Sequence, residues 1–360
     1  MPFTILYPDA KPEKLEIESQ AVGNDVTLIH ARQKSFEAID RAIWESADAI
    51  VVSRLPIDGT VIPHLKRCRI IVRNGVGFDV LDLQGLGAAG IPACNIPDYG
   101  TTEVADSAIA MMLAFARGTA TLDNALREDM AGNWTHERNV TAKRLRGATF
   151  GVIGLGRIGT AAALRARAFG MRVVFYDPLL PGGTELGLGF ERARSLEELL
   201  GQADVIDMHT PLSDKTRTMI NAETVKMIKP GAFLINTSRG PVCDTAALLA
   251  GLKSNRLLAV GLDVLPKEPG QADDPLVAAW RANESWIRGR VLLNPHAAFY
   301  SPDAYVDQRT KAVQTAYNYL RDGTLVNCVN VEYLTKKREK RERGKGKGRN
   351  QPSRRFVSTP

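Results

Sequence analysis

The feature that most restricts the fold is a glycine-rich turn in the middle of the chain, GLGRIG at residues 154–159. An apolar run over residues 149–153 precedes it and predicts a buried parallel strand, and the alanine-rich residues 160–169 predict a helix. Residues 172–176 predict a second strand, which Asp177 follows directly. Strand, glycine turn, helix, strand and terminal acid in this order are typical of a domain that binds a dinucleotide.

The glycines and the acid have separate physical roles in such a turn. Gly154 permits the tight turn, Gly156 allows the backbone to approach a pyrophosphate, and Gly159 lets helix and strand pack closely. The N-terminus of the helix adds free N–H groups and a partial positive charge for the pyrophosphate. Asp177 can accept hydrogen bonds from the adenosine ribose and repels a 2′-phosphate, and no Lys or Arg follows in residues 178–180. We therefore expect NAD rather than NADP as the cofactor.

The composition is typical of a globular protein with more than one core. The 360 residues are 44% hydrophobic, and no run reaches the roughly 20 apolar residues that span a bilayer. Residues 1–14 lack the basic-then-apolar order of a signal peptide. The four cysteines are Cys68, Cys94, Cys243 and Cys328. Their spacing does not suit a metal ion, so we expect free thiols in a cytoplasmic protein without a metal site.

The positive charge of the chain is concentrated at its C-terminus. Residues 335–360 hold 11 Lys or Arg and 2 Asp or Glu, which gives this tail a net charge of +9. The rest of the chain has a net charge of −2, so the total is +7. The Gly, Pro and charge content of the tail predicts disorder and, at most, non-specific contact with phosphates. The near-neutral remainder makes a nucleic-acid-binding fold the least favoured interpretation.

Strand and helix patterns alternate on both sides of residue 100, which predicts two α/β domains. In the first domain we expect strands at 3–7, 49–53, 69–72 and 92–95 and helices at 35–46 and 81–89. A long helix is expected at 102–131. In the second domain we expect six strands, at 149–153, 172–176, 204–208, 232–236, 258–262 and 291–294. A helix at 304–320 and a short strand near 326–331 have no place in a six-stranded dinucleotide-binding sheet, so we expect the chain to return to the first domain, with a cleft between the two.

Polar residues follow the strands of the second domain at their carboxyl ends, where ligands bind open α/β sheets. Arg239 either forms an ordinary salt bridge or binds a substrate carboxylate through two hydrogen bonds from its guanidinium group. His296 can transfer protons, and Glu268 can bind the far nitrogen of that ring and favour its protonated form. Each residue alone could be structural, but three on one rim favour a catalytic set. The glycine-rich loop at 73–79, RNGVGFD, is either an ordinary turn or an anion-binding one.

With these motifs the chain resembles the D-isomer-specific 2-hydroxyacid dehydrogenases over roughly residues 45–330. The segments that carry the resemblance are RNGVGFD, NIPDYGTTEVADSA, GVIGLGRIG, FYDP, HTPLSDKT, INTSRGPVCD, GLDVLPKEP and NPHAAF. FYDPLLPGG and HAAFYS look most similar to the C-terminal binding protein branch, which includes NADH-responsive transcriptional corepressors.

The resemblance implies an NAD-binding Rossmann domain at 99–298, inserted into a smaller flavodoxin-like substrate domain at 1–98 and 299–332, followed by the basic tail. It implies a homodimer that interconverts 2-hydroxy and 2-oxo acids, in which Arg239 binds the substrate, His296 donates the proton and Glu268 supports it. The implied cofactor contacts are Val76, Ile153, Gly154, Leu155, Gly156, Arg157, Ile158, Gly159, Asp177, Thr210, Pro211, Leu212, Thr216, Thr237, Ser238, Arg239 and Asp263. The implied substrate contacts are Arg73, Val76, Gly77, Arg239, His296 and Phe299.

Departures from the family pattern leave the substrate open. Val80, Ser107 and Phe299 stand where relatives often carry Asn, His and Trp, and residues 269–290 form a longer segment than usual. Phe299 either faces the substrate side chain or packs in the core. A metabolic dehydrogenase is the main hypothesis. The alternatives are an NADH-gated binding protein with vestigial turnover and a nucleic-acid-associated protein that acts through its tail.

Overall fold

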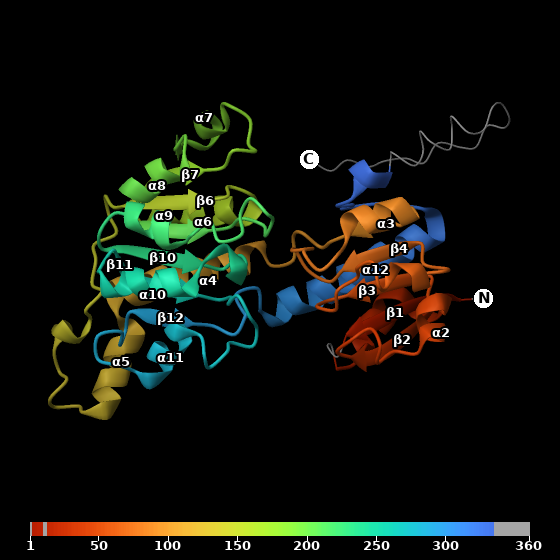
Figure 1. Ribbon diagram of the computed structural model, residues 1–360, viewed down its shortest axis with the longest axis horizontal. Coiled ribbons are helices and arrows are strands. Elements are labelled where there is room, and N and C mark those ends of the chain that lie inside the picture. Colours follow the sequence, from red (N-terminus) through yellow and green to blue (C-terminus); the bar gives the residue numbers. More distant parts are fainter. Residues whose placement is uncertain (1, 10–12, 335–360) are drawn as a thin grey trace. The chain divides into compact units, whose positions relative to one another are not determined.

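The computed structural model describes residues 2–9 and 13–334, and the chain divides into two compact units (Figure 1). Unit 1 comprises Met1–Gly100 and Ser301–Pro360, and unit 2 comprises Thr101–Tyr300. Unit 1 is therefore built from both ends of the chain, whereas unit 2 is contiguous. The basic tail expected at 335–360 lies outside the described residues. None of the described helices combines the length and apolarity that a bilayer span requires.

Unit 2 contains a parallel sheet of seven strands in the order β12-β11-β10-β9-β6-β7-β8. The strands are β6 (Thr149–Ile153), β7 (Arg172–Tyr176), β8 (Glu191–Arg192), β9 (Val205–Met208), β10 (Ala232–Asn236), β11 (Leu257–Leu262) and β12 (Val291–Leu293). The first six in chain order have the 3-2-1-4-5-6 arrangement of the dinucleotide-binding fold, and β12 extends one edge. The expected count of six strands was wrong, because β8 has only two residues and leaves no periodic pattern.

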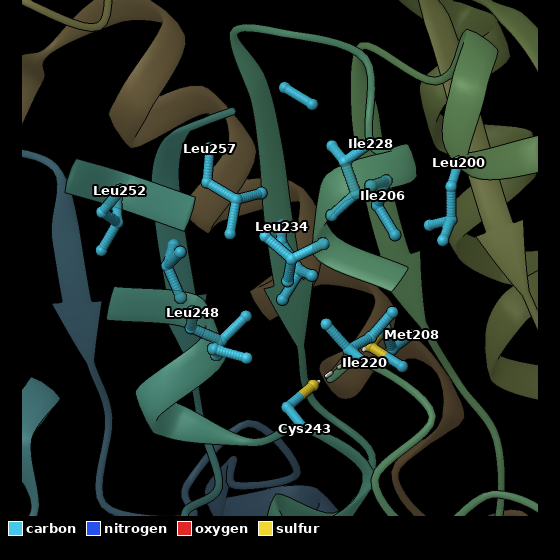
Figure 2. Packing of buried hydrophobic residues seen from close by; sticks show 14 of the residues in the cluster. Leu200, Ile206, Met208, Ile220, Ile228, Leu234, Cys243, Leu248, Leu252 and Leu257 are labelled. Carbon is cyan, nitrogen blue, oxygen red and sulfur yellow. Dashed lines mark hydrogen bonds between the residues drawn. The ribbon is translucent and has the colours of Figure 1, made fainter. Parts of the chain in front are cut away.

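Helices cover both faces of this sheet. The described helices of unit 2 are α4 (Thr101–Arg117), α5 (Thr119–Glu128), α6 (Arg157–Ala168), α7 (Thr184–Leu188), α8 (Leu196–Gln202), α9 (Ala222–Met227), α10 (Thr245–Lys253) and α11 (Pro275–Ala282), with short 3₁₀ turns η3 (His136–Arg138) and η4 (Gly240–Val242). One apolar cluster joins the strands to α4 and α6, and a second joins them to α8, α9, α10 and α11. Figure 2 shows part of the second cluster, in which Leu234 of β10 and Ile206 of β9 lie among side chains of neighbouring helices such as Leu248.

The single helix expected at 102–131 is two helices. Gly118 separates α4 from α5 with a φ of 65°, a left-handed conformation that glycine adopts without strain and that a continuous helix cannot contain. α5 then ends at Glu128, three residues before the expected end. The apolar pattern was correct for α4, whose residues Met111, Met112 and Phe115 are buried.

Unit 1 contains a parallel sheet of five strands in the order β2-β1-β3-β4-β5, the strand order of flavodoxin-like folds. The strands are β1 (Phe3–Asp9), β2 (Val26–Gln33), β3 (Ala49–Val52), β4 (Ile70–Arg73) and β5 (Ala93–Cys94). The helices are α1 (Glu16–Val22), α2 (Arg41–Ser46), α3 (Leu83–Ala89) and α12 (Pro302–Asp322), with 3₁₀ turns η1 (Gly23–Asp25) and η2 (Ile62–His64). The predicted class, a Rossmann sheet with a flavodoxin-like partner, is confirmed.

Some boundaries of unit 1 differ from the expected ones. The helix expected at 35–46 begins only at Arg41, where the Asp40 carboxylate accepts a hydrogen bond from the Ala42 N–H and caps the helix. The strand expected near 326–331 was also wrong, because this segment forms one isolated antiparallel bridge, between Cys94 and Cys328. The fully buried Asn330 replaces strand pairing there, since its side chain accepts from the Ala93 N–H at 2.9 Å.

Candidate active site and cofactor cradle

The glycine-rich turn joins β6 to α6, and its glycines differ in what surrounds them. Gly154 has a φ of 90°, and a Cβ there would lie 2.9 Å from the carbonyl oxygen of His209. A Cβ on Gly159 would overlap the carbonyl oxygen of Gly154, so this position holds helix and turn in close contact. A Cβ on Gly156, the N-cap of α6, would meet no atom within 4 Å. The backbone at Gly156 therefore faces open space beside a helix N-terminus, which suits a pyrophosphate.

Asp177 follows β7 and is fastened to this turn. Its Oδ2 accepts a hydrogen bond from the Leu155 N–H at 3.0 Å, and its Oδ1 accepts one from the Leu179 N–H at 3.0 Å. These two bonds fix the carboxylate next to the glycine turn, where the fold places the adenosine ribose. The side chain is half-buried, so the carboxylate is still reachable.

Arg192 of β8 is a cation beside this acid that the sequence pattern did not reveal. Its Nε donates to Glu185 at 2.8 Å, and its guanidinium also donates to the carbonyls of Asp177, Leu180 and Pro181. The ring of Phe175 lies 4.8 Å from the guanidinium carbon. Arg192 therefore braces the loop after β7, and its donors are engaged by that loop.

The residues after β9 and β10 carry hydroxyl groups at the carboxyl end of the sheet. Among the described residues, the buried hydroxyls of Thr210 and Thr237 have no hydrogen-bond partner, which is costly unless a ligand supplies one. Ser238 is bonded internally, because its N–H and Oγ both contact Asn236 Oδ1, at 2.9 and 2.8 Å. Thr216 braces the turn of residues 211–216 by donating to the Pro211 carbonyl at 2.6 Å. The turn, the acid and the two unpartnered hydroxyls together fit a dinucleotide.

The other cofactor contacts expected from the family lie on the same segments. Leu155, Arg157 and Ile158 belong to the turn and the start of α6, and Pro211 and Leu212 follow Thr210 directly. Ile153 is the last residue of β6 and is fully buried.

A short polar contact joins His296 and Glu268. His296 Nδ1 lies 2.7 Å from Glu268 Oε2, and about a quarter of each side chain is exposed, 28% and 27%. Because an ionised carboxylate only accepts, Nδ1 carries the proton and Nε2 is the nitrogen left to exchange a proton with a ligand. The two residues are 28 positions apart and follow the neighbouring strands β11 and β12.

Asp263 holds the segment that carries His296. Its carboxylate accepts hydrogen bonds from the N–H groups of Ala297 and Ala298, both at 2.9 Å, and its carbonyl accepts from the His296 N–H at 2.8 Å. Burial raises the pKa of Asp263. His296 is held in a left-handed conformation with a φ of 55°. Asp263 therefore anchors the histidine segment, and its expected contact with the cofactor stays a prediction.

Three further residues complete this region of unit 2. Arg239 follows β10, and a Cβ on the next residue, Gly240, would overlap the backbone of Leu265, so the turn after β10 packs against the loop that leads to Glu268. Ser107 of α4 donates to the Ala298 carbonyl at 3.0 Å and ties that helix to the histidine segment. Phe299 is half-buried, unlike the buried phenylalanines of the cluster that includes α4 and α6.

The loop expected to bind a carboxylate belongs to unit 1 and is anchored through its carbonyls. Asn74 accepts from Gln308 Nε2 at 3.1 Å, and Val76 accepts from Asn95 Nδ2 at 2.6 Å. The Gly75 carbonyl accepts from the Ile96 N–H at 3.0 Å. Arg73 is the last residue of β4 and the first of this loop, and Gly77 follows Val76 within it. Sequence reasoning missed Asn95 and Gln308, which no local motif marks.

One buried pair near the turn was also missed. Asp207 and His209 are almost fully buried and join Oδ2 to Nε2 at 2.7 Å. The His209 N–H donates to the Ile153 carbonyl, so the pair lies directly beside the glycine turn. In the described part of the chain, no group of three or more His, Cys, Asp or Glu residues is arranged to hold a metal ion.

Comparisons with known proteins agree with this geometry. The family model described as D-isomer specific 2-hydroxyacid dehydrogenase, NAD binding domain, matches residues 109–298. The chain is 35% identical to a glyoxylate reductase of Korarchaeum cryptofilum (strain OPF8) over 282 residues, 78% of this chain and 81% of that protein. It is 29% identical to C-terminal-binding protein 1 of Caenorhabditis elegans over 308 residues, 83% of this chain but only 41% of the length of that protein.

A solved structure gives the same result in three dimensions. D-lactate dehydrogenase from Aquifex aeolicus, complexed with NAD and lactic acid, superposes with a TM-score of 0.78 at 26% identity and covers 92% of this chain and 98% of its own. The resemblance that the motifs indicated is thereby confirmed, together with NAD as the cofactor. The chain belongs to the D-isomer-specific 2-hydroxyacid dehydrogenase family, and residues 109–298 match the NAD-binding domain of that family.

Proposed function

We propose that the chain is an NAD-dependent D-2-hydroxyacid dehydrogenase that reduces small 2-oxo acids, with His296 as the proton donor and Arg239 as the ligand of the carboxylate. The observation that carries the proposal is the hydrogen bond of 2.7 Å between His296 Nδ1 and Glu268 Oε2 at the carboxyl end of the sheet. Relatives named glyoxylate reductase and D-lactate dehydrogenase support a small 2-oxo or 2-hydroxy acid as the substrate.

Residues of the chain supply the proton for the reacting oxygen and stabilise the negative charge that develops on it. When bound, NADH supplies the hydride that is added to the keto carbon. His296 delivers a proton from Nε2 to the oxygen that becomes the hydroxyl group, and Glu268 stabilises the protonated ring through Nδ1. Arg239 binds the carboxylate and stabilises negative charge on the reacting oxygen. Reduction thus needs the protonated ring and oxidation needs the neutral one.

Residues of unit 2 are proposed to hold the cofactor. The N-terminus of α6 and the open backbone at Gly156 suit the pyrophosphate, and the Asp177 carboxylate suits the ribose hydroxyls. Thr210 and Thr237 offer hydroxyls near the reacting end. The loop of Val76 and Gly77 and the side chains of Arg73 and Phe299 are proposed to contact the substrate, with Val76 also near the cofactor.

The decisive experiment measures NADH oxidation with a panel of acids: glyoxylate, hydroxypyruvate, pyruvate and longer 2-oxo acids. His296→Ala is expected to lower kcat by about 100- to 10,000-fold with an unchanged Kd for NADH. His136→Ala is the matched control, because it removes the same kind of side chain from an exposed position in η3. Near-parental rates in His296→Ala would show that another group donates the proton.

Glu268→Gln tests the support of the histidine. The change removes a negative charge beside the ring while roughly keeping its shape, so the protonated ring loses stabilisation. The kcat for reduction of 2-oxo acids is therefore expected to fall while the Kd for NADH stays the same. A kcat equal to that of the parent chain means that Glu268 does not act through His296.

The likeness to C-terminal-binding protein 1 favours a second candidate, an NADH-responsive binding protein with weak turnover. A kcat far below about 1 s⁻¹ with every acid of the panel, together with NADH-dependent capture of a partner, supports that candidate. We further propose a cytoplasmic homodimer, as the family implies. Light scattering of the purified chain and fractionation of the source cells test these two points.

A further inference from the structure

Two cysteines of unit 1 face each other across an antiparallel bridge. Cys94 ends β5, and Cys328 lies in the segment that follows α12. The flanking backbone bonds run from Asn95 N to Asn327 O at 3.2 Å and from Val329 N to Ala93 O at 2.8 Å. Cys94 and Cys328 are therefore a non-hydrogen-bonded pair, in which facing Cα atoms are about 4.5 Å apart. A disulfide accepts Cα separations of about 4.4–6.8 Å, so the backbone is already suited to one.

The two thiols differ in exposure and acidity. Cys94 is fully buried, whereas Cys328 is half-buried. A hydrogen bond from Cys94 lowers the pKa of Cys328 to about 7. The same bond, together with burial, raises the pKa of Cys94. The pair thus combines a reachable thiolate with a buried thiol next to it, whereas burial raises the pKa of Cys68 to about 12.

This pair adjoins the loop that is proposed to bind the substrate. Asn95 directly follows Cys94, and its side chain donates to the Val76 carbonyl at 2.6 Å. On the other side, the Cys328 thiol donates to Asn330 Oδ1 at 3.3 Å, and the same oxygen accepts the Ala93 N–H. A change in the separation of the two sulfurs is therefore passed through one covalent neighbour and one short hydrogen bond to the loop of residues 73–79.

We propose that Cys94 and Cys328 form a site of reversible oxidation by hydrogen peroxide, and that their disulfide weakens binding of the 2-oxo acid at the loop of residues 73–79. The chemistry depends only on the cysteine pair, while the effect on substrate binding rests on the proposed function. The two-residue arrangement matches a redox-sensing pair, in which an accessible low-pKa thiolate lies next to a resolving thiol.

The reaction balances with one peroxide. The Cys328 thiolate attacks a peroxide oxygen, the O–O bond breaks, and the departing oxygen takes up a proton to become water, which leaves Cys328 as a sulfenic acid. The Cys94 sulfur then attacks the Cys328 sulfur, the S–O bond breaks, and a second water leaves with the Cys94 proton. The two sulfurs give up two electrons and one peroxide becomes two waters.

Oxidation is expected to raise KM for the 2-oxo acid, because the loop of residues 73–79 is proposed to contact that substrate. An S–S bond of about 2.05 Å pulls the two side chains together and strains the Asn95 contact with Val76. Loss of one such hydrogen bond corresponds to a rise in KM of about 2- to 13-fold.

The experiment treats the full-length chain with hydrogen peroxide, alkylates the remaining thiols in denaturant, and maps tryptic peptides by mass spectrometry. The expected product joins peptide 74–117 to peptide 322–336, the two that contain Cys94 and Cys328, and dithiothreitol releases it. Cys328→Ser abolishes the cross-link, and Cys94→Ala does so independently if the serine variant unfolds. Cys68→Ser is the matched control and keeps the cross-link, because Cys68 lies outside the bridge.

The outcomes separate the two proposals. Oxidation of single cysteines without the 94–328 cross-link, in a folded chain, overturns the site. A cross-link that leaves KM unchanged in an active enzyme overturns its effect on substrate binding. A reversible cross-link in a chain that turns over no acid supports the oxidation site and contradicts the proposed function instead.

Discussion

Gly156→Ala is expected to weaken NADH binding while unit 2 remains folded. A Cβ at this position meets no atom within 4 Å, and the φ of −75° is open to alanine, so the chain has room for the methyl group. Alanine is a poorer N-cap than glycine by about 0.5–1 kcal/mol. Alanine also reduces the entropy of the unfolded chain, which stabilises by about 0.4–1 kcal/mol. The two effects offset each other, so the Tm is expected to stay within about 4 °C.

The same methyl group occupies the space through which a pyrophosphate approaches the N-terminus of α6. Hydrogen bonds from backbone N–H groups to a charged phosphate contribute about 1.5–3 kcal/mol each. The loss of one such bond weakens the Kd for NADH by about 10- to 100-fold. Binding therefore changes far more than stability, which is the signature of a position that faces a ligand.

Titration of the chain with NADH by calorimetry, beside thermal melts of the free chain, measures both quantities. Gly159→Ala is the matched control, because its Cβ would overlap the Gly154 carbonyl and force α6 to move. Overpacking of this kind costs about 1–3 kcal/mol and lowers the Tm by about 2–12 °C. If Gly156→Ala binds NADH as tightly as the parent chain, the turn does not hold the pyrophosphate. A Tm loss equal to that of Gly159→Ala would refute the open space at Gly156.

Three further changes test other parts of the chain. Asp177→Ala should reduce the preference for NADH over NADPH, because it removes the carboxylate that repels a 2′-phosphate. The ratio of the kcat/KM values for the two cofactors measures this preference, and a parent chain that uses both cofactors equally well contradicts the reasoning. The rate of cross-linking by peroxide should rise as the pH passes about 7 and then level off, because the hydrogen bond from Cys94 lowers the pKa of Cys328 to about 7 and the thiolate is the nucleophile. Quenched time courses measure this rate, and a rate that continues to rise up to pH 9 contradicts that pKa. Arg290→Met should lower the free energy of unfolding by about 3 kcal/mol or more, because the buried guanidinium donates to the carbonyls of Leu252, Leu257 and Leu258, which then lose a partner. Denaturant titration measures this free energy, and an unchanged unfolding midpoint contradicts the prediction.

The elements that could be predicted from sequence are those whose environment repeats along the chain. The strands β6, β7 and β10 have the predicted bounds, because β6 and β10 are buried at every position and β7 has a buried centre, which gives continuous apolar runs. β2 was missed because it forms an edge of its sheet and its mixed residues are mostly half-buried. The break at Gly118 was missed because a glycine inside an apolar period does not by itself reveal its φ.

The contacts that hold the site are mostly between residues far apart in sequence, and such contacts leave no local pattern. The approach of Glu268 to His296 could be anticipated, since both follow neighbouring strands of one sheet. The hydrogen bonds that Asp263 accepts from the N–H groups of Ala297 and Ala298 could not be anticipated, because they depend on the left-handed conformation of His296. The bonds of Arg192 to the loop after β7 depend on β8, which the sequence pattern did not show.

The divided composition of unit 1 has a consequence for the order in which the chain folds during synthesis. α12 packs on β3 and β4, and Asn330 completes the edge at β5, yet both are made only after the whole of unit 2. A ribosome that adds about 5–20 residues per second needs roughly 10–50 s to proceed from residue 100 to residue 330. During this interval the first hundred residues wait for the helix that covers their sheet, while the contiguous unit 2 can fold as soon as it emerges. The nascent N-terminal segment is therefore the part of this chain with the greatest need of a chaperone.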